Sequence, residues 1–141
     1  MKTKEIVIKV VICIMAAIGL VMGFVYVLSP TLMPYHFAFL DKTQDQLEPR
    51  TFDLFMVMKR IIGAHFLGLS FGALLLMGRF AKGDTFVRWS LLVMVLISQA
   101  SLLYGGYIVQ SGLMLRSLNV IEIVLVLFIF FLAKRPKAAK T

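Results

Sequence analysis

The chain has 141 residues, of which 60% are hydrophobic and 16% are charged. Soluble domains are usually about half apolar and about a quarter charged, so this composition indicates a protein embedded in a lipid bilayer. A spanning helix needs ~20 mostly apolar residues, and four of them would use roughly 80 residues and leave no room for a soluble domain. We therefore expect one transmembrane domain over residues 1–141. The net charge of +8 does not indicate a nucleic-acid partner, because the basic residues flank apolar segments.

The first apolar segment, about 6–28, contains a stretch from Val10 to Leu28 that follows Lys2, Lys4 and Lys9 in the manner of a signal peptide. It is longer than a typical signal core, and no small-x-small cleavage site follows it. Proline cannot continue a helix, so Ser29-Pro30 ends the segment. We expect an uncleaved transmembrane helix. Cys13 lies inside it and is the only cysteine, so neither an intrachain disulfide nor a thiol metal site is expected.

The long connection over about 29–53 is expected on the outer side of the membrane. Pro30 and Pro34 stiffen its start, Phe37 to Leu40 is apolar, and Asp41 to Glu48 has the character of a short helical turn. Loops of this length usually have a role beyond connection. The sequence leaves two readings open, namely a lid over the outer mouth of the bundle and a linker adsorbed to the membrane surface.

Three further apolar segments follow at about 54–78, 87–108 and 113–133. We expect Thr51 to cap the first of these helices and Asp84 or Thr85 to cap the second, since short polar side chains satisfy free N–H groups at helix starts. Gln110-Ser111-Gly112 predicts a tight turn, so the last two helices should be antiparallel neighbours. The fold class is therefore an all-α membrane protein, a bundle of four transmembrane helices with a long outer loop between the first two.

The lysines and arginines predict the orientation, because cytoplasmic flanks carry an excess of them. Ten of the fifteen basic residues would share one side after four crossings: Lys2, Lys4, Lys9, Arg79, Lys82, Arg88, Lys134, Arg135, Lys137 and Lys140. The loop over about 29–53 instead carries an excess of acidic residues. We expect both termini in the cytoplasm.

Small residues at four-residue spacing allow helices to approach closely in lipid. The first helix contains Gly19-x-x-x-Gly23, and the second contains Ala64-x-x-x-Gly68-x-x-x-Gly72. Ser98, Ser101 and Gly105 form a similar stripe on the third helix. We expect these stripes to pack within the chain. The alternative is a homodimer formed through Gly19 and Gly23 or through Ala64, Gly68 and Gly72.

Polar residues inside the spans are the candidates for chemistry, because they are costly in lipid and usually face protein or water. The candidate set is Arg60, His65, Gln99, Tyr104, Arg116, Asn119 and Glu122. Counted from the inner ends at ~1.5 Å per residue, they lie from mid-membrane outward. Glu122 requires a partner, for which Arg60 is the first choice and His65 the second. The pair would be a structural ion pair, a ligand contact or a proton carrier. Lys59 is expected to reach the outer headgroups.

Neither a metal nor a cofactor is expected. His36 with Met33 in the loop, or Met56 and Met58 near His65, would make a poor copper site because methionine is an ordinary apolar filler. The sequence also contains no nucleotide-binding loop and no nucleophile motif.

The segment from Ser29-Pro30 through Leu32-Met33-Pro34-Tyr35-His36, with Leu47-Glu48-Pro49 and Lys59 to Gly63, carries a resemblance. It resembles a family of small, uncharacterised bacterial four-helix membrane proteins, over about a third of the chain. In size and topology alone, the chain is also similar to the DoxX-like proteins. The resemblance implies a bacterial inner membrane, and it supplies neither a reaction nor functional residues.

Three functions are weighed on this basis. The first is a non-catalytic membrane protein, either an accessory subunit or a module that binds lipid or another hydrophobic ligand in its outer half. The second is a small proton-coupled transporter that uses Glu122 and His65, which would need a dimer because four helices are few for alternating access. The third is an enzyme acting on a quinone-like or sterol-like substrate. The absence of a catalytic motif favours the first.

Overall fold

The structure is a computed structural model that describes residues 2–108 and 113–133. These residues contain helices and turns, with no strand. The elements are α1 (Lys2–Leu28), α2 (Pro34–Leu40), a short 3-10 helix (Gln44–Gln46), α3 (Pro49–Ala81), α4 (Thr85–Ile108) and α5 (Leu113–Leu132). The prediction of an all-helical chain is confirmed.

Among the described residues, three helical stretches are long and apolar enough to cross a membrane. They are Thr3–Leu28, Pro49–Ala81 and Thr85–Ile108. Large apolar side chains cover the outside of the helices, and Leu28, Leu75 and Phe86 are each more than two-thirds exposed. Contact of so much apolar surface with water is energetically unfavourable, whereas contact with lipid tails is not. The chain has the character of an integral membrane protein.

Helices α1, α3 and α4 extend beyond the apolar segments that predict them. Helix α3 starts at Pro49, which occupies its first turn, and Thr51 lies inside the helix, so the predicted Thr51 cap is wrong. Proline fits a first turn because the N–H it lacks would have no partner there. The predicted cap at Asp84 is confirmed, since its carboxylate accepts a hydrogen bond from the Val87 N–H at 3.1 Å. The turn predicted at Gln110-Ser111-Gly112 lies outside the described residues.

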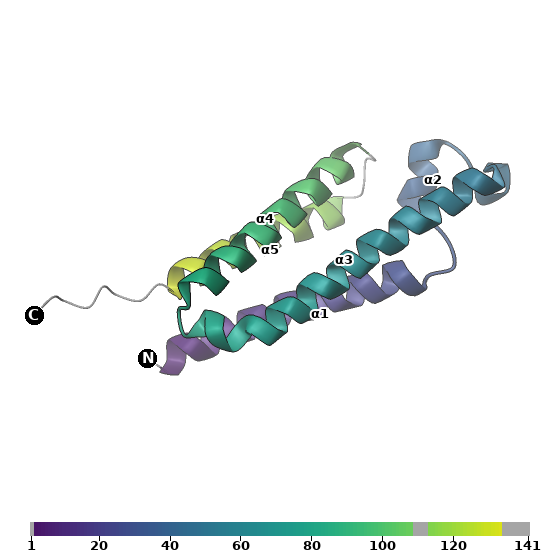
Figure 1. Ribbon diagram of the computed structural model, residues 1–141. Helices are drawn as coiled ribbons and strands as arrows, with labels where there is room; N and C mark the ends of the chain where they lie inside the picture. Colours follow the sequence, from purple (N-terminus) through teal and green to yellow (C-terminus); the bar gives the residue numbers. More distant parts are fainter. Residues whose placement is uncertain (1, 109–112, 134–141) are drawn as a thin grey trace, which may run out of the picture.

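The long helices form two hairpins, α1 with α3 and α4 with α5 (Figure 1). In the first hairpin the backbones nearly touch, because a Cβ added to Gly23 would lie 3.0 Å from the Gly63 carbonyl oxygen. Gly19 also faces α3, so the first small-residue stripe packs within the chain as predicted. The second stripe does not, since Gly68 and Gly72 would have no atom within 4 Å of an added Cβ. Gly63, which the pattern did not include, makes the close contact between α3 and α1 instead.

Two apolar cores join the hairpins near the end that contains the N-terminus. The first core, which draws on all four long helices and the residue after α5, consists of Ile8, Ile12, Phe80, Ala81, Val87, Leu91, Ile129 and Ala133. The second consists of Leu92, Val95, Val126 and Phe130, with Met15 and Leu69 packed against it. This end of the molecule is therefore closed by apolar packing.

The connection between α1 and α3 is folded rather than loose. Leu32 and Leu47 from the connection form a third apolar core with Met56 of α3. Lys59 is 1% exposed and donates hydrogen bonds to the carbonyl oxygens of Ser29 at 2.6 Å and Thr31 at 2.7 Å. The expectation that Lys59 reaches the headgroups is wrong, because two carbonyls beside Pro30 use its ammonium. The connection thus covers the end of the α1–α3 hairpin that lies away from the N-terminus. We call this end the outer end, and the connection the outer connection, after the predicted orientation.

Candidate functional site

Two adjacent polar residues of α4, Ser98 and Gln99, are buried and face different helices. Successive helical residues point about 100° apart, so neighbours in sequence reach separate partners. The Ser98 hydroxyl lies 2.8 Å from Nε2 of His65 on α3. The Gln99 Nε2 amide donates a hydrogen bond to the carboxylate of Glu122 on α5. These four residues, which we call the polar seam, connect three helices across the middle of the molecule.

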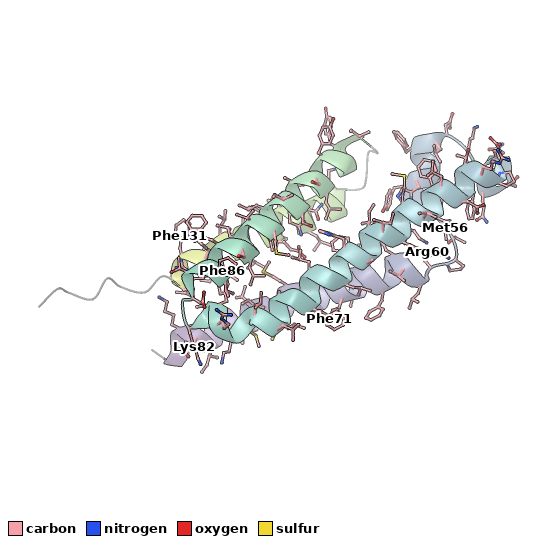
Figure 2. The ribbon with its side chains drawn as sticks, in the orientation of Figure 1. Met56, Arg60, Phe71, Lys82, Phe86 and Phe131 are labelled. Atoms are coloured by element: carbon pink, nitrogen blue, oxygen red, sulfur yellow. The ribbon has the colours of Figure 1, made fainter. Side chains whose placement is uncertain are left out.

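The partner of Glu122 in the structure is Gln99, not Arg60 or His65. Arg60 is exposed on α3, about one turn from Met56 (Figure 2), and makes no ion pair within the described residues. Helices α3 and α5 are diagonally opposed, because each packs beside α1 and α4. A side chain of α3 therefore meets α4 before α5, which explains why His65 binds Ser98. Gln99 is the residue that reaches Glu122.

Gln99 retains a buried hydrogen-bonding group without a partner. Its side chain is 1% exposed, and its Oε1 atom accepts no hydrogen bond within the described part of the chain. An unsatisfied buried acceptor costs free energy, so most are paired in folded proteins. The seam thus offers a carboxylate and one free amide oxygen, and its His65 end is exposed.

The remaining predicted residues lie outward of the seam. Tyr104 is 70% exposed and does not contact it. Arg116 and Asn119 are partly buried on α5, and the Asn119 side chain makes no hydrogen bond among the described residues. The structure therefore brings His65, Gln99 and Glu122 together with Ser98. The sequence placed Ser98 in a packing stripe and gave no sign of its bond to His65.

Outward of the seam, the facing surfaces of α3 and α4 are uncovered. Met58 lies about two turns outward from His65, and Gly105 about two turns outward from Ser98, so both share the faces that meet at the seam. Met58 is 51% exposed, and a Cβ on Gly105 would have no atom within 4 Å. Inward of the seam, Leu91 on the same face of α4 is 4% exposed. The hairpins thus diverge toward their outer ends (Figure 1). We call the surface of Met58, His65, Ser101 and Gly105 the inter-hairpin face.

A second polar group, missed by sequence reasoning, holds the outer connection. The hydroxyls of Tyr26 and Tyr35 are hydrogen-bonded, and burial raises the pKa of Tyr35 above its ordinary value. His36 Nδ1 accepts a hydrogen bond from the Met33 N–H at 3.3 Å. Burial and the nearby Lys59 ammonium hold the pKa of His36 below its ordinary 6.5. The group has a structural role, since its bonds fix the start of α2.

No cluster of three or more histidine, cysteine, aspartate or glutamate side chains suited to a metal ion occurs in the described residues. Comparison with models of known protein families gives no match, and comparisons with curated proteins and with solved structures give none either.

Proposed function

We propose that the chain is a non-catalytic protein of the bacterial inner membrane that binds a lipid or another hydrophobic ligand between the outer halves of its two hairpins. In this proposal α1, α3, α4 and α5 all cross the membrane, and both termini are cytoplasmic. The observation that carries it is the divergence of the hairpins outward of the polar seam. Lipid-facing helices that separate inside a bilayer leave a space that an apolar molecule fills.

The arrangement of the chain ends supports this topology. The N-terminus, the α3–α4 turn and the end of α5 lie at one end of the molecule (Figure 1). Arg79 and Lys82 lie at that turn. The outer connection with its acidic residues lies at the other end. Because cytoplasmic flanks attract basic residues, the first end is assigned to the cytoplasm.

The chemistry of the inter-hairpin face supports a mostly apolar ligand with one polar group. Met58 offers apolar surface, and Gly105 leaves the backbone of α4 open to close approach. His65 is exposed at the inner end of this face, where it meets a polar group of the ligand. A non-catalytic role is favoured because Glu122 and His65 bind different neighbours, Gln99 and Ser98, and do not form an acid–base pair.

Photo-crosslinking tests this proposal directly. A benzophenone amino acid is placed at Met58 or Gly105 on the inter-hairpin face, and at Leu75, which is 85% exposed on another face of α3, as the control. After irradiation in native membranes, intact-mass analysis identifies the adducts. We expect one dominant small-molecule adduct at Met58 and Gly105, and a mixture that follows bulk lipid composition at Leu75.

Two other results would change the assignment. The same bulk-lipid mixture at all three positions would contradict a ligand site. A single protein adduct at Met58 and Gly105 would instead show that a helix of a partner covers this face, as in an accessory subunit. A homodimer through Ala64, Gly68 and Gly72, which leave one side of α3 open, would appear as an adduct of twice the chain mass.

A further inference from the structure

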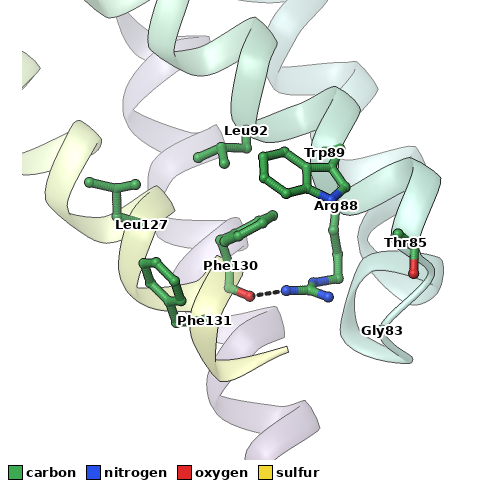
Figure 3. Close-up of a pocket in the computed structure, with 8 residues that line it drawn as sticks. All are labelled: Gly83, Thr85, Arg88, Trp89, Leu92, Leu127, Phe130 and Phe131. Atoms are coloured by element: carbon green, nitrogen blue, oxygen red, sulfur yellow. Dashed lines mark hydrogen bonds between the residues drawn. The ribbon is translucent and has the colours of Figure 1, made fainter. Parts of the chain in front are cut away.

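A pocket of about 680 Å³ lies between α4 and α5 beside the α3–α4 turn, far from the inter-hairpin face. Arg88, Trp89 and Leu92 line it from α4, and Leu127, Phe130 and Phe131 line it from α5 (Figure 3). It opens at the end of the molecule that contains the N-terminus. The lining combines one cation with a broad apolar surface.

Arg88 has more hydrogen-bond donors than the protein uses. Its side chain is 6% exposed, and its guanidinium lies 4.5 Å from the centre of the Phe130 ring. Nη2 donates to the Phe130 carbonyl oxygen at 2.5 Å, which is one of the carbonyls left free at the end of α5. Capping of α5 therefore accounts for one of five N–H donors. The buried Nε–H has no partner within the described residues.

The charge of Arg88 also has no counter-ion among residues 2–108 and 113–133. None of the residues that line the pocket is acidic. Asp84, one turn before Arg88, is the natural partner by position, but Arg79 holds its carboxylate at 2.7 Å. The Val87 N–H and Arg79 together keep the pKa of Asp84 below its ordinary 3.8. A buried cation with unused donors requires an anion, and the described residues supply none at this place.

The apolar part of the pocket has the form of a groove for an alkyl chain. Leu92 and Phe130 are buried and form its base, while Trp89 and Phe131 are more than half exposed and form its sides. The rings of Trp89 and Phe130 meet edge to face at 4.8 Å between centroids. Tryptophan favours the level of the lipid headgroups, which places Arg88 at phosphate depth.

We propose that this pocket binds an anionic phospholipid, with its phosphate on Arg88 and one acyl chain along Leu92, Leu127 and Phe131. Arginine matches phosphate oxygens with paired N–H donors, and basic pockets between helices at the cytoplasmic surface bind anionic headgroups. The lipid supplies the acceptors that the guanidinium lacks. The inner leaflet follows from the proposed topology, but the binding itself does not depend on it.

Native mass spectrometry of the purified full chain tests the proposal. Phosphatidylglycerol and phosphatidylcholine with identical acyl chains are added in turn, and the bound fractions are compared. We expect the wild type to prefer phosphatidylglycerol and Arg88→Gln to lose about fivefold in affinity for it. Lys82→Gln removes one charge at the same end outside the pocket and should retain the preference.

Arg88→Gln also removes the cap on α5, so a second variant keeps the proposal testable. Leu127→Trp fills the groove and leaves Arg88 in place, and it should lose phosphatidylglycerol binding with little change in helix content by circular dichroism. Equal binding of the two lipids by the wild type, or an unchanged preference in both pocket variants, would overturn the proposal. Displacement of the lipid by millimolar inorganic phosphate would also overturn it, because a small-anion site does not need the groove.

Discussion

Lys59, Gln99 and Glu122 show what burial demands of single polar side chains. All three are buried, and each finds its partner in a nearby carbonyl, amide or carboxylate. The contribution of such a bond to stability is set by the cost of losing it, because a buried polar group without a partner has given up its hydrogen bonds to water and forms none in the protein. The consequences for stability can therefore be derived bond by bond.

Replacement of Lys59 by methionine is expected to loosen the outer connection. The Ser29 carbonyl would lose its Lys59 donor, which costs about 1–3 kcal/mol, and the Thr31 carbonyl would keep only the Ser29 hydroxyl as a donor. Thermal unfolding in detergent should show a clear loss of stability, and a protease should cut the connection faster. Arg60→Met is the control, because Arg60 is exposed and next in sequence. Equal stability of the two variants would contradict the bonding seen for Lys59.

Glu122→Gln is expected to leave stability unchanged or to raise it slightly. The new amide would still accept from Gln99 Nε2, and its own N–H would reach the unpaired Gln99 Oε1. Glu122→Leu removes the hydrogen bond from Gln99, leaves the whole Gln99 amide unpaired, and should destabilise the chain by about 1–3 kcal/mol. Unfolding midpoints of the three proteins in one detergent measure the difference. A large loss in Glu122→Gln would show that the carboxylate has a partner besides Gln99.

His36 is expected to make the outer connection sensitive to pH. Its Nδ1 must be unprotonated to accept from the Met33 N–H. Because its pKa is lower in the folded chain than the ordinary 6.5, the unfolded chain binds the proton first as the pH falls. Stability is thus complete above pH 6.5 and declines below it, toward the folded pKa. Unfolding midpoints from pH 8 to pH 5 should fall in the wild type more than in His36→Gln, which keeps an acceptor but does not titrate. Parallel curves would contradict this role.

At the scale of elements, the α1–α3 hairpin depends on contact between glycine backbones. A Cβ on Gly63 would lie 2.9 Å from the Gly23 carbonyl oxygen and 2.8 Å from the Tyr26 Cβ. Gly63→Ala should therefore force the helices apart and cost about 1–3 kcal/mol. Gly68→Ala, in the same helix with no atom within 4 Å, should be neutral. Unfolding in increasing SDS compares the two, and an equal effect would show that α1 does not approach α3 at Gly63.

The positions of the helices could be predicted from the sequence, whereas most of their contacts, apart from that of the Gly19 and Gly23 stripe, could not. Apolar runs predicted α1, α3 and α4 because membrane crossing imposes a length. The contact at Gly63 could not be predicted because a glycine on its own gives no four-residue pattern. The pairing of Gln99 with Glu122 depends on which helices are neighbours and which are diagonal. Hydropathy carries no information on that arrangement, so the charge of Arg60 suggested the wrong partner.

The packing of the helices differs between the two ends of the molecule. One end is closed by apolar cores that all four long helices share. At the other end, the described core joins only the outer connection and α3. Under the proposed function, this asymmetry favours ligand entry from the outer leaflet, and the proposal requires that the two ends face opposite sides of the membrane.

Cysteine labelling tests that orientation over the whole chain. On a Cys13→Ser background, which removes the only native cysteine, single cysteines replace Lys42 in the outer connection, Lys82 in the α3–α4 turn and Lys140 near the C-terminus. An impermeant maleimide should label Lys42→Cys in intact cells, and the other two only after the membrane is opened, because basic flanks remain in the cytoplasm. Labelling of Lys82→Cys in intact cells would contradict the orientation. If Lys140→Cys is labelled in intact cells together with Lys42→Cys, while Lys82→Cys is not, the chain crosses the membrane three times and α5 does not span it. The topology on which the outer ligand site depends would then be wrong.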